Sequence, residues 1–203
     1  MYNTQESSEP RKVILVTDGD QVARKAVERA AADAGCRVIS RSSGNPTPLS
    51  GEQIVRLVQH AKHDPVVVMF DDNGDGDFGF GEKALEYLVK HPQIDVLGAI
   101  AVASNTPFVE GVHVDFSIDQ NGRMIEDGVD KDGIPVKTGE AVVYGDTVDV
   151  LAECEVPVII GVGDIGKMQG KDHFLKGAPV TKQAILEILK RSGYSHGSDQ
   201  TKH

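Results

Sequence analysis

Tryptophan is absent from this chain of 203 residues, and all aromatic residues together make up only 5% of it. A hydrophobic core must therefore rest on Val, Ile, Leu and Ala, which a chain of this length and 39% hydrophobic content can supply. Basic residues are also scarce, because 21 Lys and Arg face 31 Asp and Glu, for a net charge of −10. That balance argues against nucleic acid as a partner, since such binding needs Lys and Arg side chains that neutralise the phosphates.

Long apolar runs are missing as well. The longest, Val96 to Ala103, is far short of the roughly 20 residues that span a bilayer. The first ten residues are polar and do not resemble a secretory signal. We therefore expect no transmembrane segment and no signal peptide, with any membrane contact made through other proteins. Two cysteines, Cys36 and Cys154, are expected to be buried thiols rather than a disulfide.

Hydrophobic periodicity predicts an α/β fold. Short β-branched runs alternate with segments whose apolar residues recur at helical spacing. The expected strands are 13–16, 38–40, 66–70, 94–103 and 156–160, and the expected helices are 20–34, about 50–61, 82–90, 147–154 and one capped by Thr181. Such alternation implies a mostly parallel sheet with helices on both faces, as in toprim-like and Rossmann-like folds. Residues 112–125 alternate apolar and polar side chains and predict a β-hairpin insertion with one wet face.

The domain organisation predicted from these patterns is simple. Residues 11–193 are expected to form a single α/β domain, preceded by a disordered segment, 1–10, and followed by a flexible tail, 194–203.

One loop carries the most specific chemical signal. Residues 71–82 read DDNGDGDFGFGE and match the calcium-loop pattern D-x-[DN]-x-[DN]-G-x5-E in full. Ca²⁺ takes six to eight hard oxygen ligands, and this spacing wraps them around one ion. The expected metal ligands are Asp71, Asn73, Asp75, Asp77 (through its carbonyl) and Glu82. The alternative is a solvated turn, because a strand rather than a helix is predicted before the loop.

A second acidic strand end contains Asp18 and Asp20. Carboxyl ends of parallel strands share one edge of a sheet, so Asp18 and Asp71 are expected to face each other. The alternative for Asp18 is the N-cap of the first helix. This arrangement resembles the toprim fold of topoisomerases, primases and some nucleases, in which acids after two strands hold Mg²⁺. The likeness covers residues 11–105, but the first acid is Asp where that family usually has Glu, and the acidic loop is longer.

A weaker signal is Gly161 to Gly166, which fits the G-x-G-x-x-G phosphate-binding pattern after a strand. The helix and second acidic strand that a dinucleotide site needs are not predicted beside it. A tight loop is the favoured interpretation, and a nucleotide or dipicolinate site is the alternative.

Over nearly its whole length, the sequence resembles the stage V sporulation protein AE family of spore-forming bacilli, in its soluble form. The resemblance rests on 11–20, on 66–82, on Gly98 to Ser104 and on Gly161 to Lys171. It implies a non-catalytic accessory protein of the calcium-dipicolinate uptake and release machinery, acting in sporulation and germination at the spore inner membrane. Other stage V sporulation proteins would be its partners. The open alternatives are a toprim-like, Mg²⁺-dependent nuclease or phosphotransfer enzyme, and a small-molecule binding domain.

Overall fold

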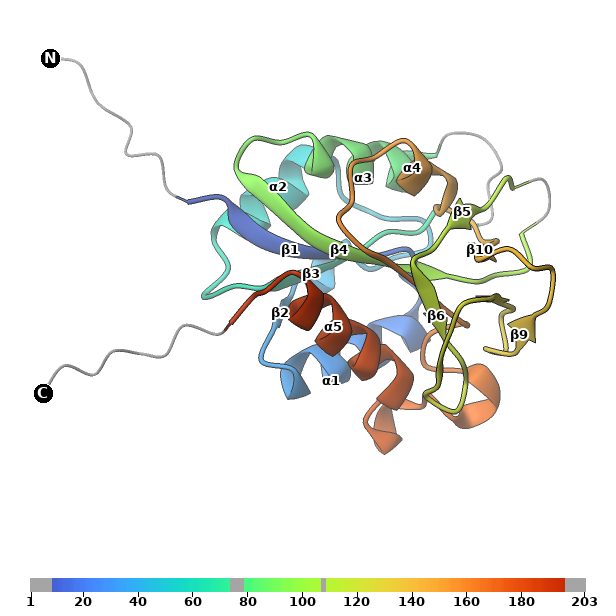
Figure 1. The fold of residues 1–203 in the computed structure, drawn as a ribbon. Helices are drawn as coiled ribbons and strands as arrows, with labels where there is room; N and C mark the ends of the chain where they lie inside the picture. Colours follow the sequence, from blue (N-terminus) through green and yellow to red (C-terminus); the bar gives the residue numbers. More distant parts are fainter. Residues whose placement is uncertain (1–8, 74–78, 107–108, 196–203) are drawn as a thin grey trace, which may run out of the picture.

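A computed structural model describes residues 9–73, 79–106 and 109–195 (Figure 1). The strands are β1 (Arg11–Val16), β2 (Arg37–Val38), β3 (Val66–Met69), β4 (Ile94–Val102), β5 (Val112–His113), β6 (Phe116–Ile118), β7 (Met124–Ile125), β8 (Gly128–Val129), β9 (Pro135–Val136), β10 (Val142–Val143) and β11 (Ile159–Val162). The helices are α1 (Gln21–Asp33), α2 (Gly51–Gln59), α3 (Phe80–Val89), α4 (Asp149–Ala152) and α5 (Pro179–Arg191), with three short 3₁₀ turns at Ser40–Ser42, Met168–Gly170 and Phe174–Lys176.

A seven-stranded sheet in the order β2-β3-β1-β4-β11-β6-β7 forms the centre of the molecule. All its pairings are parallel except the hairpin between β6 and β7. Two small antiparallel sheets, β5 with β10 and β8 with β9, lie beside it. The predicted α/β class with a parallel sheet and hairpin additions is therefore confirmed.

Helices cover both faces of this sheet (Figure 1). Successive side chains of a strand point to opposite faces, so Ile14 and Val16 join one core cluster while Val13 and Leu15 join the other. The first cluster is covered by α1 and α5 and the second by α2, α3 and α4. The buried stripe of α1 is mostly alanine, which lets this helix approach the sheet closely. The core thus relies on small and branched aliphatic residues, as the composition requires.

Two helix starts follow from local sequence. The Asp20 carboxylate accepts hydrogen bonds from the N–H groups of Val22 and Ala23 at the start of α1. Asp20, and not Asp18, is therefore the N-cap, so the capping alternative for Asp18 is wrong. The predicted capping box of α2 is confirmed, because Ser50 and Gln53 each accept a hydrogen bond from the other's backbone N–H.

The second half of the chain departs from the local pattern. Residues 112–118 divide into two strands, since β5 pairs with β10 whereas β6 joins the main sheet beside β11. All three residues of β6 are buried, so the expected wet face is absent there. The late strand also begins at Ile159 rather than at Val156. Short strands of this kind are fixed by their neighbours in the sheet, and local periodicity does not contain that information.

The cysteines are both free, as expected. Cys36 is buried, and burial raises the pKa of its thiol to about 11. Cys154 is only half-buried, so the expectation of burial holds fully for Cys36 alone.

The start of α5 depends on one buried carboxylate from outside the helix. Thr181, the expected cap, lies inside α5, and Ala178 occupies the N-cap position without a side-chain hydrogen bond. Asp172 is 0% exposed and accepts hydrogen bonds from the N–H groups of Val180 and Thr181, from the Thr181 hydroxyl (2.6 Å) and from the Gly166 N–H. This carboxylate therefore ties the loop after β11 to the last helix.

We predict that Asp172→Ala lowers the free energy of unfolding by about 3–5 kcal/mol, because it leaves several buried donors unpaired. Asp172→Asn keeps one acceptor oxygen and should cost less. Urea denaturation followed by circular dichroism measures both, with Glu126→Ala on the exposed surface as a control that should change stability by under about 0.5 kcal/mol. An Asp172→Ala protein as stable as the unmutated one would contradict this role.

Candidate functional site

The candidate site is a cavity of about 170 Å³ at the carboxyl ends of four neighbouring parallel strands, β3, β1, β4 and β11. Ligands of open α/β sheets bind outside this edge. Of the residues that the structure describes, five aspartates and one lysine line the cavity, together with a few small polar and apolar residues: Thr17, Asp18, Asp20, Asn45, Asp71, Val102, Ala103, Ser104, Thr106, Asp146, Asp164 and Lys167. Larger hollows exist elsewhere on the molecule, but fewer charged side chains line them.

The ends of β1 and β4 are fastened together just below the cavity. The Thr17 hydroxyl accepts a hydrogen bond from the Val102 N–H and donates one to the Ile100 carbonyl. The next residue, Asp18, then projects from the strand end into the cavity lining. Burial raises the pKa of Asp18 well above its usual value, and the nearby carboxylates of Asp20, Asp164 and Asp71 raise it further.

Asp71 reaches the same cavity from the end of β3. It is 5% exposed, and its two carboxylate oxygens accept hydrogen bonds from the N–H groups of Gly19 (3.2 Å) and Asn73 (2.9 Å). Burial raises the pKa of Asp71 to about 6, and Asp146 and Asp20 add to the effect, while the two backbone donors oppose it. The structure thus brings Asp18 and Asp71 to one cavity, as the parallel topology predicts.

Gly19 makes this approach sterically feasible. A Cβ atom at this position would come within 2.9 Å of the Gly44 carbonyl oxygen and 3.1 Å of the Asp71 Cβ. A larger residue between Asp18 and Asp20 would therefore push the ends of β1 and β3 apart.

Lys167 is the cation of the site. Its ammonium group lies 2.7 Å from Asp20 and 2.9 Å from Asp164. Burial alone would lower the pKa of Lys167, but the two carboxylates outweigh it and raise that pKa. Burial would likewise raise the pKa of Asp20, yet the hydrogen bonds from Lys167, Ala23 and Val22 lower it. Burial raises the pKa of Asp164, and this effect outweighs the lowering caused by Lys167.

Sequence reasoning missed Asp146, Asp164 and Lys167. Asp164 lies within the Gly161–Gly166 motif and Lys167 directly follows it, so the motif marks the position of the site although its acid and lysine were not identified as site residues. Asp146 arrives from the loop between β10 and α4, where its backbone N–H donates to the Ser104 hydroxyl. Its placement depends on long-range packing that no local pattern encodes.

The predicted calcium loop is described only at its two ends. Asp75 and Asp77 lie outside the described residues, and Asn73 donates its N–H to Asp71. Glu82 accepts a hydrogen bond from the Gly79 N–H at the start of α3. Burial raises the pKa of Glu82, and Asp72, Asp149 and Asp146 raise it further.

The neighbouring Asp72 has a structural role at the start of α3. Its carboxylate accepts hydrogen bonds from the N–H groups of Gly81 and Glu82 and from the Thr147 hydroxyl. Within the described ranges, no three Asp, Glu, His or Cys side chains are grouped closely enough to hold a metal ion by themselves. Calcium binding by the complete 71–82 loop stays a prediction.

The fold and the cavity define a class of protein: an α/β protein with an acidic cavity at the carboxyl edge of a parallel sheet. The chain belongs to the SpoVAE family, described as stage V sporulation protein AE1, whose model matches residues 12–192. Membership gives the protein a role in sporulation. No curated protein and no solved structure gives a significant match, so the toprim likeness stays a prediction. No helix in the described part of the chain has the length and apolar character to cross a membrane.

We predict that Asp71→Asn flattens the dependence of stability on pH, in protein freed of divalent ions with EDTA. Because the pKa of Asp71 is raised to about 6 from an ordinary value of 3.8, the folded state holds its proton more tightly than the unfolded chain. The resulting stability is fully present below about pH 4 and is lost as pH rises through about 6.

Urea denaturation at several pH values between 4 and 8 measures this effect as the stability difference between the unmutated and Asp71→Asn proteins. That difference should shift in favour of the variant as pH rises. Glu126→Gln, which removes a carboxylate on the exposed surface, is the control for the loss of one negative charge. A constant difference for Asp71→Asn would show that this carboxyl titrates normally.

Proposed function

We propose that this protein is a non-catalytic accessory protein of the machinery that moves calcium dipicolinate into the forming spore and out at germination. In this proposal the carboxyl-edge cavity and the 71–82 loop bind Ca²⁺, with Asp71 common to both. The observation that carries it is the gathering of five aspartates around a single lysine at the ends of four strands. A cation is the ligand that relieves such a concentration of negative charge.

The donor chemistry of the cavity suits a hard cation. Carboxylate and carbonyl oxygens are the ligands that Ca²⁺ prefers. Burial and neighbouring carboxylates raise the pKa values of Asp18 and Asp71, so a bound cation would stabilise their charged forms. Asp18 and Asp71 would contribute from the strand ends, with the remaining oxygens coming from the loop or from water. The ion would neutralise the site and favour its charged carboxylates.

A non-catalytic role is supported by how firmly the other polar groups are engaged. Lys167 is held as a cation by two carboxylates, so it is a poor general base. Asp20 caps α1, and the Ser104 hydroxyl is paired with the Thr106 hydroxyl. No His or Cys is among the described residues that line the cavity, so this lining lacks the Ser–His or Cys–His pair of many hydrolases.

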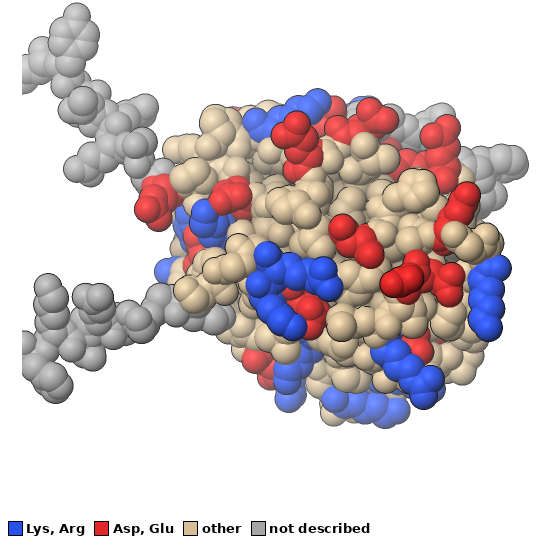
Figure 2. Space-filling view, viewed as in Figure 1, with Lys and Arg blue, Asp and Glu red and all other residues tan. Residues whose placement is uncertain are grey.

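The proposed location is the surface of the spore inner membrane, where other stage V sporulation proteins would hold the protein. The overall charge supports docking on proteins rather than on anionic lipid. Acidic side chains spread over the upper and right-hand parts of the face in Figure 2, and the basic ones gather mainly in its lower half, towards α1 and α5.

One observation favours a second candidate, a toprim-like Mg²⁺-dependent nuclease or phosphotransfer enzyme: Asp18 and Asp71 line the same cavity, as that hypothesis requires. In that case Mg²⁺ would supply charge stabilisation to a phosphoryl group. Incubation with labelled DNA, RNA and nucleoside triphosphates in Mg²⁺ or Mn²⁺ separates the two candidates, since the accessory protein should leave all of them intact.

We predict that calorimetric titration of the EDTA-treated protein with CaCl₂ gives saturable binding, with a dissociation constant between about 1 μM and 1 mM. Asp71→Asn should weaken it at least about ten-fold. Asp18→Asn and Glu82→Gln then locate the ion, because the first alters only the cavity and the second only the loop. Gln at position 82 can still accept the Gly79 hydrogen bond and so preserves the start of α3.

Asp95→Asn is the matched control, since Asp95 lies at the opposite edge of the same sheet, next to Lys12. Its calcium binding should equal that of the unmutated protein. Absence of any calcium binding up to millimolar concentrations would end the proposal for both the cavity and the loop. Repeating the titration with dipicolinate, alone and with Ca²⁺, tests whether the small molecule joins the ion.

In cells, deletion of the gene should leave vegetative growth intact and slow the release of dipicolinate during germination. Complementation with the Asp71→Asn variant should restore release only in part, whereas the Asp95→Asn variant should restore it fully. Dipicolinate release measured by terbium fluorescence gives the rates. Unchanged rates in the deletion strain would count against a place in this machinery.

A further inference from the structure

The amino-terminal half of β4 has an open edge. The pairing between β1 and β4 begins at Ile94, but the pairing between β11 and β4 begins only at Ala99. Within the described part of the chain, no strand pairs with residues 94–98 on the side away from β1. Backbone N–H and C=O groups of a strand point alternately to its two sides, so some groups of this segment point to the open edge.

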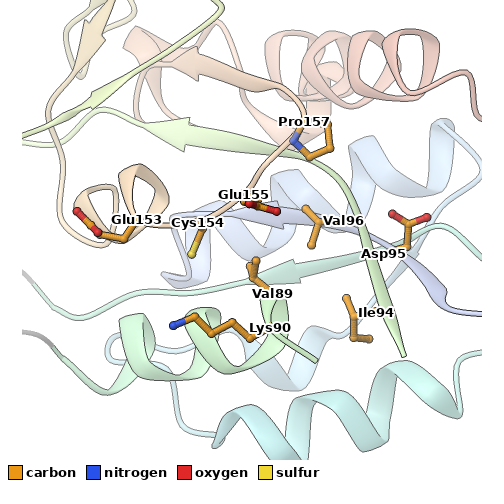
Figure 3. A pocket seen from close by; sticks show the side chains of 9 residues that line it. All are labelled: Val89, Lys90, Ile94, Asp95, Val96, Glu153, Cys154, Glu155 and Pro157. Atoms are coloured by element: carbon orange, nitrogen blue, oxygen red, sulfur yellow. The ribbon is translucent and has the colours of Figure 1, made fainter. Parts of the chain in front are cut away.

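Two adjoining hollows lie along this edge, with volumes of about 500 and 390 Å³. They share Asp95, Val96 and Pro157 and so form one groove across the start of β4. Figure 3 shows the larger hollow, with Val89, Ile94 and Val96 on one side and the segment from Glu153 to Pro157 on the other. The smaller hollow continues to the residues that follow α5, from Ser192 to Ser195.

The groove has a closed end at Gly98. A Cβ atom there would come within 2.7 Å of the Val158 side chain and 2.9 Å of its carbonyl oxygen, so the chain entering β11 packs directly on this residue. The Ala99 N–H then donates to the Val158 carbonyl, which is the first bond of that ladder. Residues 94–97 have no strand partner on this side over a length of about 13 Å, enough for roughly four residues of an added strand. The Ile94 N–H is the exception among their backbone groups, since it donates to the His91 carbonyl.

The uncompensated charge of the groove is negative. Glu153 and Glu155 are exposed, and no ion pair joins either one to another described residue. The two lysines of the groove are already engaged, Lys12 with Asp95 and Lys90 with Glu86. An occupant that complements the groove therefore carries positive charge along with apolar side chains for Val89, Ile94 and Val96.

We propose that the open edge of β4 is a docking site for a partner protein, which adds an extended basic segment as a strand beside residues 94–97. Main-chain hydrogen bonds to the open edge would supply affinity that does not depend on sequence. Alternate side chains of the segment would pack against Val96 and its apolar neighbours. Its basic residues would pair with Glu153 and Glu155 and select the partner.

The probe is a fluorescein-labelled octapeptide of alternating valine and lysine, measured by fluorescence anisotropy with the full chain. We expect saturable binding that shifts the backbone NMR signals of residues 94–97. The corresponding valine–glutamate peptide should not bind. The double variant Glu153→Gln/Glu155→Gln should weaken binding about five-fold at low salt, while Glu126→Gln/Glu140→Gln, which makes the same charge change on another surface, should not.

Backbone methylation of the peptide tests the strand itself. Only every second N–H of an added strand faces the sheet, so one of two peptides methylated on alternate nitrogens should lose binding and the other should keep it. Equal behaviour of the two would overturn strand addition. Equal binding of the acidic peptide, or NMR shifts confined to the acidic cavity at the other edge, would overturn the site.

The chain's own residues 196–203 are the competing occupant, because they follow Ser195 at the groove. A variant that ends at Ser195 should bind the basic peptide with the affinity of the full chain. Binding at least ten-fold tighter in the shortened variant would assign the groove to this tail and overturn docking of a partner.

Discussion

The double ion pair of Lys167 is the interaction on which the acidic edge of this protein depends. The carboxyl ends of neighbouring parallel strands lie side by side, and here β1, β3 and β11 each lead into aspartates that line a cavity of about 170 Å³, to which the loop before α4 adds Asp146. Without a cation, Asp20 and Asp164 would repel each other and Asp18 across a poorly solvated space. Lys167 joins the loop after β11 to the start of α1 and offsets part of this repulsion. Lys167 pairs with Asp20 and Asp164 and not with Asp18 or Asp71, and these last two carboxylates make the cavity a candidate cation site.

Not every buried aspartate near this edge of the sheet is a candidate cation ligand. Asp72 and Asp172 are as deeply buried as Asp71, yet each directs both oxygens at donors of a helix start. A carboxylate surrounded by N–H and hydroxyl donors is satisfied as an anion and needs no ion. Among the described residues, Asp18 accepts one backbone hydrogen bond, from Asp20 at 3.3 Å, while the carboxylates of Asp20, Asp164 and Asp71 raise its pKa. Asp71 lies between these cases, because its two oxygens accept hydrogen bonds from only two backbone N–H groups, against three donors for Asp72 and four for Asp172 among the described residues. The number of donors around each acid, rather than burial alone, therefore distinguishes the structural aspartates from the candidate functional ones.

The sequence predicted the amino-terminal half of the fold well because its elements are long, strongly periodic and locally capped. From β1 to β4 every strand and helix was expected, and topology alone placed Asp18 and Asp71 at a common edge. The rest of the fold was predicted less well, because its elements depend on contacts with residues far away in the sequence. The residues of β6 are buried by β11 and β7, and α5 is capped by Asp172 from outside the helix. For the same reason Asp146 and Lys167 could not be assigned to the site, since each reaches it from a loop that only the finished sheet brings into place.

The length mismatch between β4 and β11 gives the two edges of the sheet different chemistry. At the carboxyl edge, β3, β1, β4 and β11 end at similar heights in the sheet. The residues that follow them therefore surround one small cavity, which has room for an ion and a few waters. At the amino edge β11 starts five residues after β4 in their register, which leaves backbone groups rather than carboxylates as the distinctive feature. The first arrangement suits a compact cation and the second an extended chain, and β4 runs through both. A ligand at one edge and a partner at the other would therefore contact the same strand.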